Sequence, residues 1–273
     1  MPKFGIDISV WQKGFNFDKA VAEGVEFAIL RGAYHLSKDK CFEDFYRACK
    51  ARKIPVGVYH YSMAKTVLEA KAEAEYLIHN VLKGKQFEYP IYMDVEDPTQ
   101  KALGKDLLTD IVVEFCETLE KAGYYVGIYS SASYFGTYMH ESKLTGFDKW
   151  VAQWSTKCTY SGNYGMWQYG GETNLLRTNK VAGVVCDQDY AFKDYPTIIK
   201  NAGLNGYGKT QTTDPVMKFE DVDEDDYYYE AVKWAVKNKI ILGVDDLHFC
   251  PNGTCTRAQV ATMIWRAMGR PEA

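Results

Sequence analysis

Two acidic residues follow a short apolar stretch of the chain. Residues 91–95 read Ile-Tyr-Met-Asp-Val, and Glu96 comes next. This composition, with Pro90 at its start, predicts a buried strand. Residues i and i+2 of a strand point to the same side, so Asp94 and Glu96 should project together. Carboxyl groups that close resist joint ionisation, and one should therefore keep its proton at a higher pH than usual.

A retained proton beside an ionised carboxylate suits acid-assisted cleavage of a glycosidic bond. The alternative is a strand that runs out into a solvated acidic loop, and the residues after Glu96, Asp97-Pro98-Thr99, fit that alternative. The rest of the chain has to decide between the two interpretations, because short acidic triplets are frequent by accident.

The elements that would position these carboxyl groups alternate along the chain. Eight segments have the composition of strands: Lys3–Ser9, Glu26–Tyr34, Pro55–Met63, Tyr89–Glu96, Val126–Ser131, Trp150–Ser155, Met166–Gly170 and Gly183–Tyr190. Helical patterns lie between the first five, at Asp18–Glu23, Cys41–Lys53, Val67–Leu82 and Leu107–Ala122. Such alternation predicts an α/β fold with a parallel sheet, and eight strands predict a closed barrel. The loops between the last three strands are too short for full helices, so we expect an irregular barrel.

Acidic residues mark the ends of three of these strands. Asp7 ends the first, Asp94 and Glu96 end the fourth, and Asp187 and Asp189 end the eighth. Active sites of parallel barrels lie at the rim where strands end, so these groups should meet at one mouth. A Mg²⁺ or Ca²⁺ site is the alternative for such a cluster. Neither phosphate-binding glycines nor clustered basic residues accompany it, and we expect no metal and no cofactor.

Other residues expected at this rim are mostly aromatic. Aromatic residues form 15% of the chain, with 21 Tyr and 6 Trp, which is more than an ordinary core needs. Flat apolar rings with a polar tip suit the faces of sugar rings. The rim candidates are Tyr34, His35, Tyr59, Tyr61, Tyr129, Trp154, Gln168 and Tyr169. All of them except His35 and Tyr59 are candidates for substrate contact, and His35, like His60, is expected to be a structural His more often than a catalytic base.

Composition excludes several classes of partner. The net charge is only −4 without a basic run, so we expect no nucleic-acid partner. No apolar run approaches the roughly 20 residues of a membrane span. The first residues lack the features of a signal peptide, and we expect synthesis in the cytoplasm. Most of the seven scattered Cys are interpreted as buried small apolar residues. Cys250 and Cys255 are close in the sequence and are either two free thiols or a disulfide across a short loop.

Several blocks resemble the family 25 glycoside hydrolases, the muramidases of the Chalaropsis lysozyme type. In the order of that family, they are Gly5-Ile-Asp-Ile-Ser-Val-Trp-Gln12, Gly57-Val-Tyr-His-Tyr61, Met93-Asp-Val-Glu96, Gly127-Ile-Tyr-Ser130, Trp150-Val-Ala-Gln-Trp154, Trp167-Gln-Tyr169 and Val185-Cys-Asp-Gln-Asp-Tyr190. The ordered set is specific and covers roughly residues 3 to 192. It implies a barrel whose last strands lack intervening helices. It also implies cleavage of the β-1,4 bond between N-acetylmuramic acid and N-acetylglucosamine in peptidoglycan.

The resemblance also implies roles for single residues. Glu96 is similar to the family's general acid, Asp94 to its partner carboxylate, and Asp7 and Asp187 to the remaining acidic pair. Asp189 stands where the family usually has Asn, and we place it among the substrate-binding residues with a structural or orienting role. Two other functions stay open: another β-glycan hydrolase such as a chitinase, and a catalytically silent wall-binding protein. The acidic run typical of chitinases is absent, because Pro90 and Ile91 occupy its earlier positions.

The C-terminal part has a different pattern. A stretch rich in Gly and Thr predicts a linker at 205–216, between a barrel at 1–204 and a module at 217–273. The module resembles an S-layer homology module at Phe219-Glu-Asp-Val222, Ile240-Ile-Leu-Gly243 and Thr256-Arg-Ala-Gln259. Such modules anchor proteins to secondary polymers of Gram-positive walls. The resemblance implies polymer contact by Arg257, Asp221 and Tyr227, although a purely structural cap is the alternative. A lone copy could also form a homo-oligomer.

Together these resemblances imply a place of action. Peptidoglycan and a secondary wall polymer are the expected partners. Because no signal peptide is evident, we expect the protein to reach the bacterial wall after release through a phage holin or by lysis.

Overall fold

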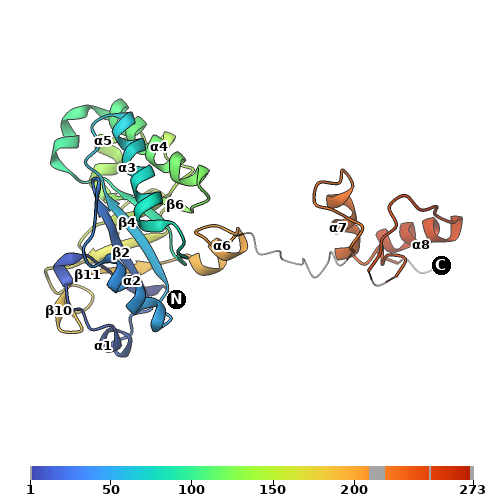
Figure 1. Ribbon diagram of the computed structural model, residues 1–273, viewed down its shortest axis with the longest axis horizontal. Helices are drawn as coiled ribbons and strands as arrows, with labels where there is room; N and C mark the ends of the chain where they lie inside the picture. The colour runs from blue at the N-terminus through green and yellow to red at the C-terminus, as the bar shows by residue number, and fades with distance from the viewer. Residues whose placement is uncertain (1, 209–218, 246, 271–273) are drawn as a thin grey trace. The chain divides into compact units, whose positions relative to one another are not determined.

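The computed structural model describes residues 2–208, 219–245 and 247–270 (Figure 1). Contacts divide the chain into two compact units, Met1–Lys209 and Thr210–Ala273. The first unit includes Asn205, whose buried side chain donates to Tyr89 O at 2.9 Å and accepts from Tyr125 N at 2.7 Å. We had expected the linker to begin at this residue. The rest of the expected linker, from residue 209 on, lies outside the described residues, and the three domain ranges stay predictions.

Eight strands of the first unit form a closed barrel, as the sequence predicts. They are β1 (Lys3–Ile8), β2 (Phe27–Tyr34), β4 (Val56–Tyr61), β5 (Ile91–Asp94), β6 (Val126–Ser131), β7 (Asp148–Ala152), β8 (Met166–Gly170) and β11 (Asp187–Ala191). β1 pairs with both β2 and β11, which closes the sheet. The short β3 (Ser37–Lys38) pairs antiparallel with the end of β2. A separate small hairpin is formed by β9 (Lys180–Val181) and β10 (Val184–Val185).

The last barrel strand differs from our expectation. Successive strands from β1 to β8 are parallel, but β11 runs antiparallel to both β8 and β1. The connection at 171–186 forms only the small β9–β10 hairpin, and the chain then returns beside β8 in the opposite direction. The start of β11 therefore lies at the rim where the other strands end. Asp187 and Asp189 reach that rim from the beginning of a strand, and not from its end as predicted.

Helices cover the barrel on one part of its outer surface. They are α1 (Phe17–Ala22), α2 (Phe42–Ala51), α3 (Val67–Leu77), α4 (Lys105–Lys121), α5 (Ala132–Tyr138) and α6 (Tyr195–Asn201). Short 3-10 helices are η1 (Val10–Gln12), η3 (Pro98–Leu103) and η4 (Glu141–Lys143), and η2 (Ile78–Leu82) is a short π-helix that continues α3. α3 and α4 pack against each other (Figure 1). Residues 153–165 and 171–186, all described, contain no helix, in agreement with the predicted irregular barrel.

The interior of the barrel is packed with aromatic rings. Phe27, Tyr92, Tyr129 and Trp150 belong to this core, whereas a largely aliphatic core lies between the sheet and the helices. Glycines on the strands make room for the rings. A Cβ atom at Gly127 would lie 2.4 Å from the Tyr92 ring. These packed rings fill the barrel interior, and we call this layer of side chains the floor of the barrel mouth.

The second unit is small. It contains α7 (Tyr229–Lys237) and α8 (Arg257–Ala267), with Phe219, Val222 and Val232 as its buried core. The predicted capping box is present at the start of α8, where Thr256 and Gln259 bond reciprocally. None of the residues of α8 is buried. Among the described residues, no helix is both long enough and apolar enough to cross a membrane.

Candidate active site

A cavity of about 60 Å³ at the barrel mouth brings together four of the five acidic residues that the sequence singles out. It is lined by Asp7, Tyr59, Asp94, Glu96, Tyr129, Trp150, Gln168 and Asp187. These residues come from β1, β4, β5, β6, β7, β8 and β11 and from the loop after β5. The cavity is too small for a sugar ring, but it could hold a substituent of the size of an acetamido group.

The backbone around Val95 aims the two central carboxyl groups. Val95 N donates to Tyr129 O at 2.9 Å, and Ser130 Oγ donates to Val95 O at 2.6 Å. Val95 is buried, so the residues on either side of it, Asp94 and Glu96, face the cavity together. Asp94 is buried, whereas the side chain of Glu96 is accessible at the surface.

Burial and mutual repulsion raise the pKa values of these acids. Burial, and then the charge of Glu96, raises the pKa of Asp94 well above its ordinary value. The Glu96 pKa is also raised, by burial and then by Asp97. Burial, Glu96 and Glu172 raise the pKa of Asp187 to about 6. The site therefore holds protons near neutral pH that ordinary surface acids would have lost.

Gln168 fixes the position of Asp7. Its Oε1 accepts hydrogen bonds from Tyr129 Oη and Trp154 Nε1, both at 3.0 Å. The amide can then only turn its Nε2 toward Asp7, to which it donates at 2.9 Å. One chain of hydrogen bonds thus runs from the rim at Trp154 to a buried acid.

Residues 6–176, more than half of the chain, match the family described as glycosyl hydrolases family 25. The chain belongs to this family. Residues 218–261 match the S-layer homology domain. The two matches agree with the two resemblances that the sequence motifs gave.

This family 25 member is similar to proteins named as lysozymes and autolysins. It is 25% identical over 167 residues to an autolytic lysozyme of Clostridium acetobutylicum, covering 60% of this chain and 49% of that protein. The modular autolysin LytC of Streptococcus pneumoniae, solved with a synthetic peptidoglycan ligand, has a TM-score of 0.58 and 25% identity over 69% of this chain and 46% of its own. A lysozyme of Streptomyces coelicolor shares the fold, with a TM-score of 0.63, 22% identity and coverage of 76% and 99%. This chain spans about half the length of the curated relative.

Three predicted aromatic residues lie at the rim of the family 25 barrel. Tyr34 and Tyr61 stack with their ring centroids 5.0 Å apart, and Tyr61 Oη donates to Asp97 Oδ2 at 3.3 Å. Tyr34 and Trp154 are 42% and 45% exposed, which leaves their rings free to meet a ligand. Tyr129 and Gln168 lie deeper and line the cavity.

Tyr169 and Asp189, two of the predicted substrate contacts, do not line the cavity. Tyr169 follows the inward-facing Gln168 in a strand, and therefore it faces outward, where it stacks on Tyr190 and donates to Gln188 Oε1 at 2.7 Å. Asp189 is fully buried below the mouth and accepts from Trp150 Nε1 at 2.8 Å. A sugar at the rim could reach neither side chain.

Sequence reasoning missed Arg31 and Trp150. Arg31 Nε lies 2.8 Å from Asp39 Oδ2, and its positive charge lowers the pKa values of Asp94 and Tyr59 against the larger effect of burial. The sequence did offer one sign of this role, because Arg31 is a basic residue inside an otherwise largely apolar strand. Trp150 is part of the cavity floor, and its place in the strand 150–155 gave no sign of that.

His35 and His60 lie behind the rim in a structural cluster. Both bond the fully buried Glu73 of α3, His35 Nδ1 at 2.8 Å and His60 Nε2 at 3.1 Å. Ser62 Oγ donates to the same carboxylate at 2.7 Å. The cluster ties the loops after β2 and β4 to α3, away from the cavity. Among the described residues, no group of three or more His, Cys, Asp or Glu could hold a metal ion.

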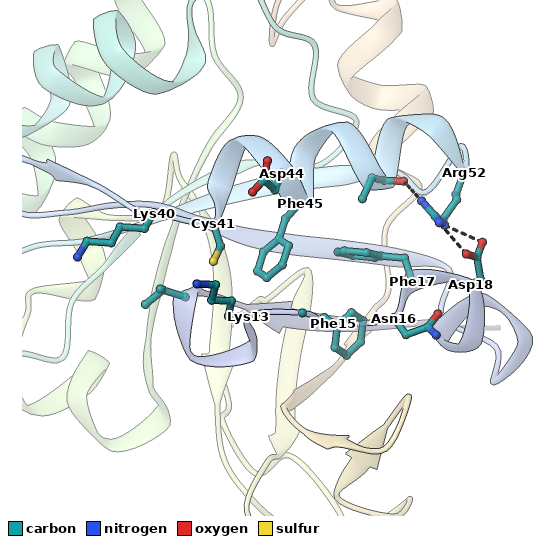
Figure 2. A pocket seen from close by; sticks show the side chains of 13 residues that line it. Lys13, Phe15, Asn16, Phe17, Asp18, Lys40, Cys41, Asp44, Phe45 and Arg52 are labelled. Atoms are coloured by element: carbon teal, nitrogen blue, oxygen red, sulfur yellow. Dashed lines mark hydrogen bonds and ion pairs between the residues drawn. The ribbon is translucent and has the colours of Figure 1, made fainter.

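A wider hollow lies between the segment 13–18 and α2 (Figure 2). It measures about 710 Å³, and Phe15, Phe17 and Phe45 line it with ring centroids 5.1 and 5.6 Å apart. Its two acidic side chains are engaged in ion pairs: Asp18 with Arg52 at 2.6 Å and Asp44 with Arg47 at 2.6 Å. This hollow therefore lacks the clustered acids of the mouth.

The predicted polymer contacts of the second unit differ in their surroundings. Tyr227 is 97% exposed, and Arg257 is exposed at the start of α8. Asp221 instead accepts from Phe249 N and Cys250 N, each at 2.8 Å, and so it holds a loop in place. Cys250 and Cys255 are two free thiols.

Proposed function

We propose that this chain hydrolyses the β-1,4 bond between N-acetylmuramic acid and N-acetylglucosamine in peptidoglycan. The observation that carries the proposal is the meeting of Asp7, Asp94, Glu96 and Asp187 at one cavity of the barrel mouth. The names of an autolytic lysozyme and of an autolysin solved with a peptidoglycan ligand support the same substrate.

Glu96 is the proposed general acid. Its side chain is accessible at the mouth, and its raised pKa keeps a proton available for the glycosidic oxygen. As the bond from C1 to that oxygen breaks, the electron pair goes to the oxygen and Glu96 supplies the proton. Positive charge develops on the sugar ring, which the ionised Asp187 would stabilise.

Asp94 is the proposed partner that orients the substrate. Its Oδ1 is buried and has no hydrogen-bond partner among the described residues, which is unusual for a carboxyl oxygen. The N–H of a 2-acetamido group in the cavity would supply the missing donor. The acetamido oxygen could then bond to C1, and water would later open this ring while Glu96 takes its proton. Direct attack by a carboxylate, or activation of water, is the alternative route.

The second unit is the proposed wall anchor. Its match to the S-layer homology domain supports action at the cell wall, and the exposed Arg257 fits a charged secondary wall polymer. Tyr227 could stack on the same polymer. Self-association through this unit, and release by a holin or by lysis, stay predictions.

Purified cell walls test the function. The wild-type chain should lower wall turbidity and leave muramic acid at the new reducing ends, whereas Glu96→Gln should fold normally and lose turnover by about a thousandfold or more. Glu75→Gln, which changes an exposed acid on α3, is the matched control and should keep full activity.

Each other outcome selects another function. N-acetylglucosamine at the new reducing ends would indicate a different glycan hydrolase. Wall binding without new reducing ends would indicate a silent binding protein. Near-normal hydrolysis by Glu96→Gln would remove Glu96 from the role of acid.

A further inference from the structure

Asp189 lies in the floor beneath the active-site cavity. It is on β11 and is fully buried. Its Oδ1 accepts from Trp150 Nε1 at 2.8 Å, but its Oδ2 has no hydrogen-bond donor among the described residues. A buried carboxylate oxygen without a donor is costly, so the surroundings of this atom need an explanation.

The neighbour of Asp189 is a second acid. In the β1–β11 pairing, Asp7 stands opposite Asp187 and Gly5 stands opposite Asp189. Gly5 has no side chain, so the nearest inward-facing side chain of β1 to Asp189 is that of Asp7, two residues further along β1. Asp7 and Asp189 also influence each other's pKa, in agreement with the closeness that the strand register gives them.

Fixed donors leave these two groups facing each other. Asp7 Oδ2 must accept from Gln168 Nε2, because Tyr129 and Trp154 already occupy the amide oxygen of Gln168. Asp189 Oδ1 must accept from the indole N–H of Trp150. The remaining contact is between two carboxyl groups, which attract each other only if one of them carries a proton.

We propose that Asp7 and Asp189 share one proton, and that Asp189 is thereby a positioning residue of the active site. The pair then carries a single negative charge. Its protonated member donates to the other, which holds Asp7 at the mouth and Trp150 in the floor. Burial raises the pKa values of both acids, in agreement with a proton that is kept. The catalytic consequence rests on the proposed function, whereas the shared proton itself does not.

The charged and titratable groups around the pair come from most of the barrel strands. They are Asp187 on β11, Asp94 on β5 with Glu96 after it, Arg31 on β2, Tyr59 on β4 and Tyr129 on β6. The acids among them add negative charge and favour retention of the proton. Arg31 opposes them, but it is ion-paired with Asp39.

Infrared spectroscopy of the full chain tests the shared proton without any substrate. At neutral pH, Asp189→Asn should remove one carboxylic-acid C=O band, because its amide can donate to an ionised Asp7. Asp44→Asn, which changes an exposed acid, should leave these bands unchanged. An unchanged set of bands in Asp189→Asn would overturn the proposal.

The pH dependence of stability gives a second readout. Unfolding releases the retained proton once the pH exceeds the ordinary Asp pKa, so the wild type loses stability as the pH rises from there toward the raised folded-state pKa. Asp189→Asn has no such proton on this residue. Its stability relative to the wild type should therefore increase over the same range, and a constant difference would contradict the proposal.

Activity measurements then test positioning. Asp189→Asn can still accept from Trp150 and donate to Asp7, whereas Asp189→Leu can do neither. We expect kcat to fall by about tenfold or more in Asp189→Leu and to be largely rescued in Asp189→Asn. Asp189→Asn should also lose less activity than the wild type at alkaline pH. Equal losses in both variants would overturn the positioning role even if the infrared result held, and inactivity of the wild type would refute only the proposed function.

Discussion

At the scale of single residues, the proposed reaction needs Glu96 protonated and Asp187 ionised at the same pH. Both carboxyl groups have raised pKa values. Burial, Glu96 and Glu172 raise the pKa of Asp187 to about 6, and burial and then the charge of Asp97 raise the pKa of Glu96. Activity should fall as the pH drops through the Asp187 pKa, because the protonated acid no longer stabilises positive charge. It should also fall at high pH, when Glu96 loses its proton.

Glu172 offers a way to shift the acidic limb of this profile. It is exposed, and its negative charge raises the pKa of Asp187. Glu172→Gln removes that charge, so the Asp187 pKa should fall and the acidic limb should move to lower pH, most clearly at low salt. The pH dependence of kcat on purified walls measures the shift. Glu75→Gln is the control, and an acidic limb that stays in place would show that Asp187 does not govern it.

The sequence predicted the acidic residues of this site better than the neutral ones. Asp94 and Glu96 share a face because strand geometry requires it, and the predicted rim brought Asp7 and Asp187 beside them. Gln168 and Tyr169 are consecutive in a strand, so their side chains point to opposite faces of the sheet. This rule alone could have shown that only one of them faces the mouth. Arg31 and Trp150 escaped notice because their roles depend on which strands become neighbours.

At the scale of elements, the barrel could be predicted except for the direction of β11. The eight strand patterns and the missing helices followed from periodicity and loop length. Residues 153–165 and 171–186 both lack a helical pattern, but the first connection joins parallel strands and the second antiparallel strands, so the connections did not reveal the direction of β11. The error did not displace the site, because the start of an antiparallel strand lies at the same rim as the ends of its neighbours.

Aromatic packing inside the barrel makes its own prediction. A methyl group at Gly127 would meet the Tyr92 ring at 2.4 Å, and the ring is enclosed by other side chains. Gly127→Ala should therefore lower the free energy of unfolding by about 2 kcal/mol through overpacking. Chemical denaturation measures this loss. Gly146→Ala is the matched control, since a Cβ there would meet nothing within 4 Å, and an equal loss in both variants would contradict the packing argument.

At the scale of the whole molecule, catalysis and wall anchoring are proposed for separate units. Arg257→Ala in the full chain should weaken binding to intact walls by about tenfold, because a charge-assisted contact is lost. Hydrolysis of short soluble peptidoglycan fragments should stay unchanged. Lys237→Ala, which removes an equal charge from α7, is the control in a wall-sedimentation assay. Unaltered sedimentation of Arg257→Ala would assign wall binding to other residues.

The central claim is that acids from distant parts of the sequence act together on one sugar at the barrel mouth. A crystal structure of Glu96→Gln with a peptidoglycan tetrasaccharide tests it most directly. We predict that an acetamido group occupies the small cavity with its N–H on Asp94, and that residue 96 contacts the oxygen of the scissile bond. A tetrasaccharide bound in the hollow beside α2, with the mouth empty, would contradict this account.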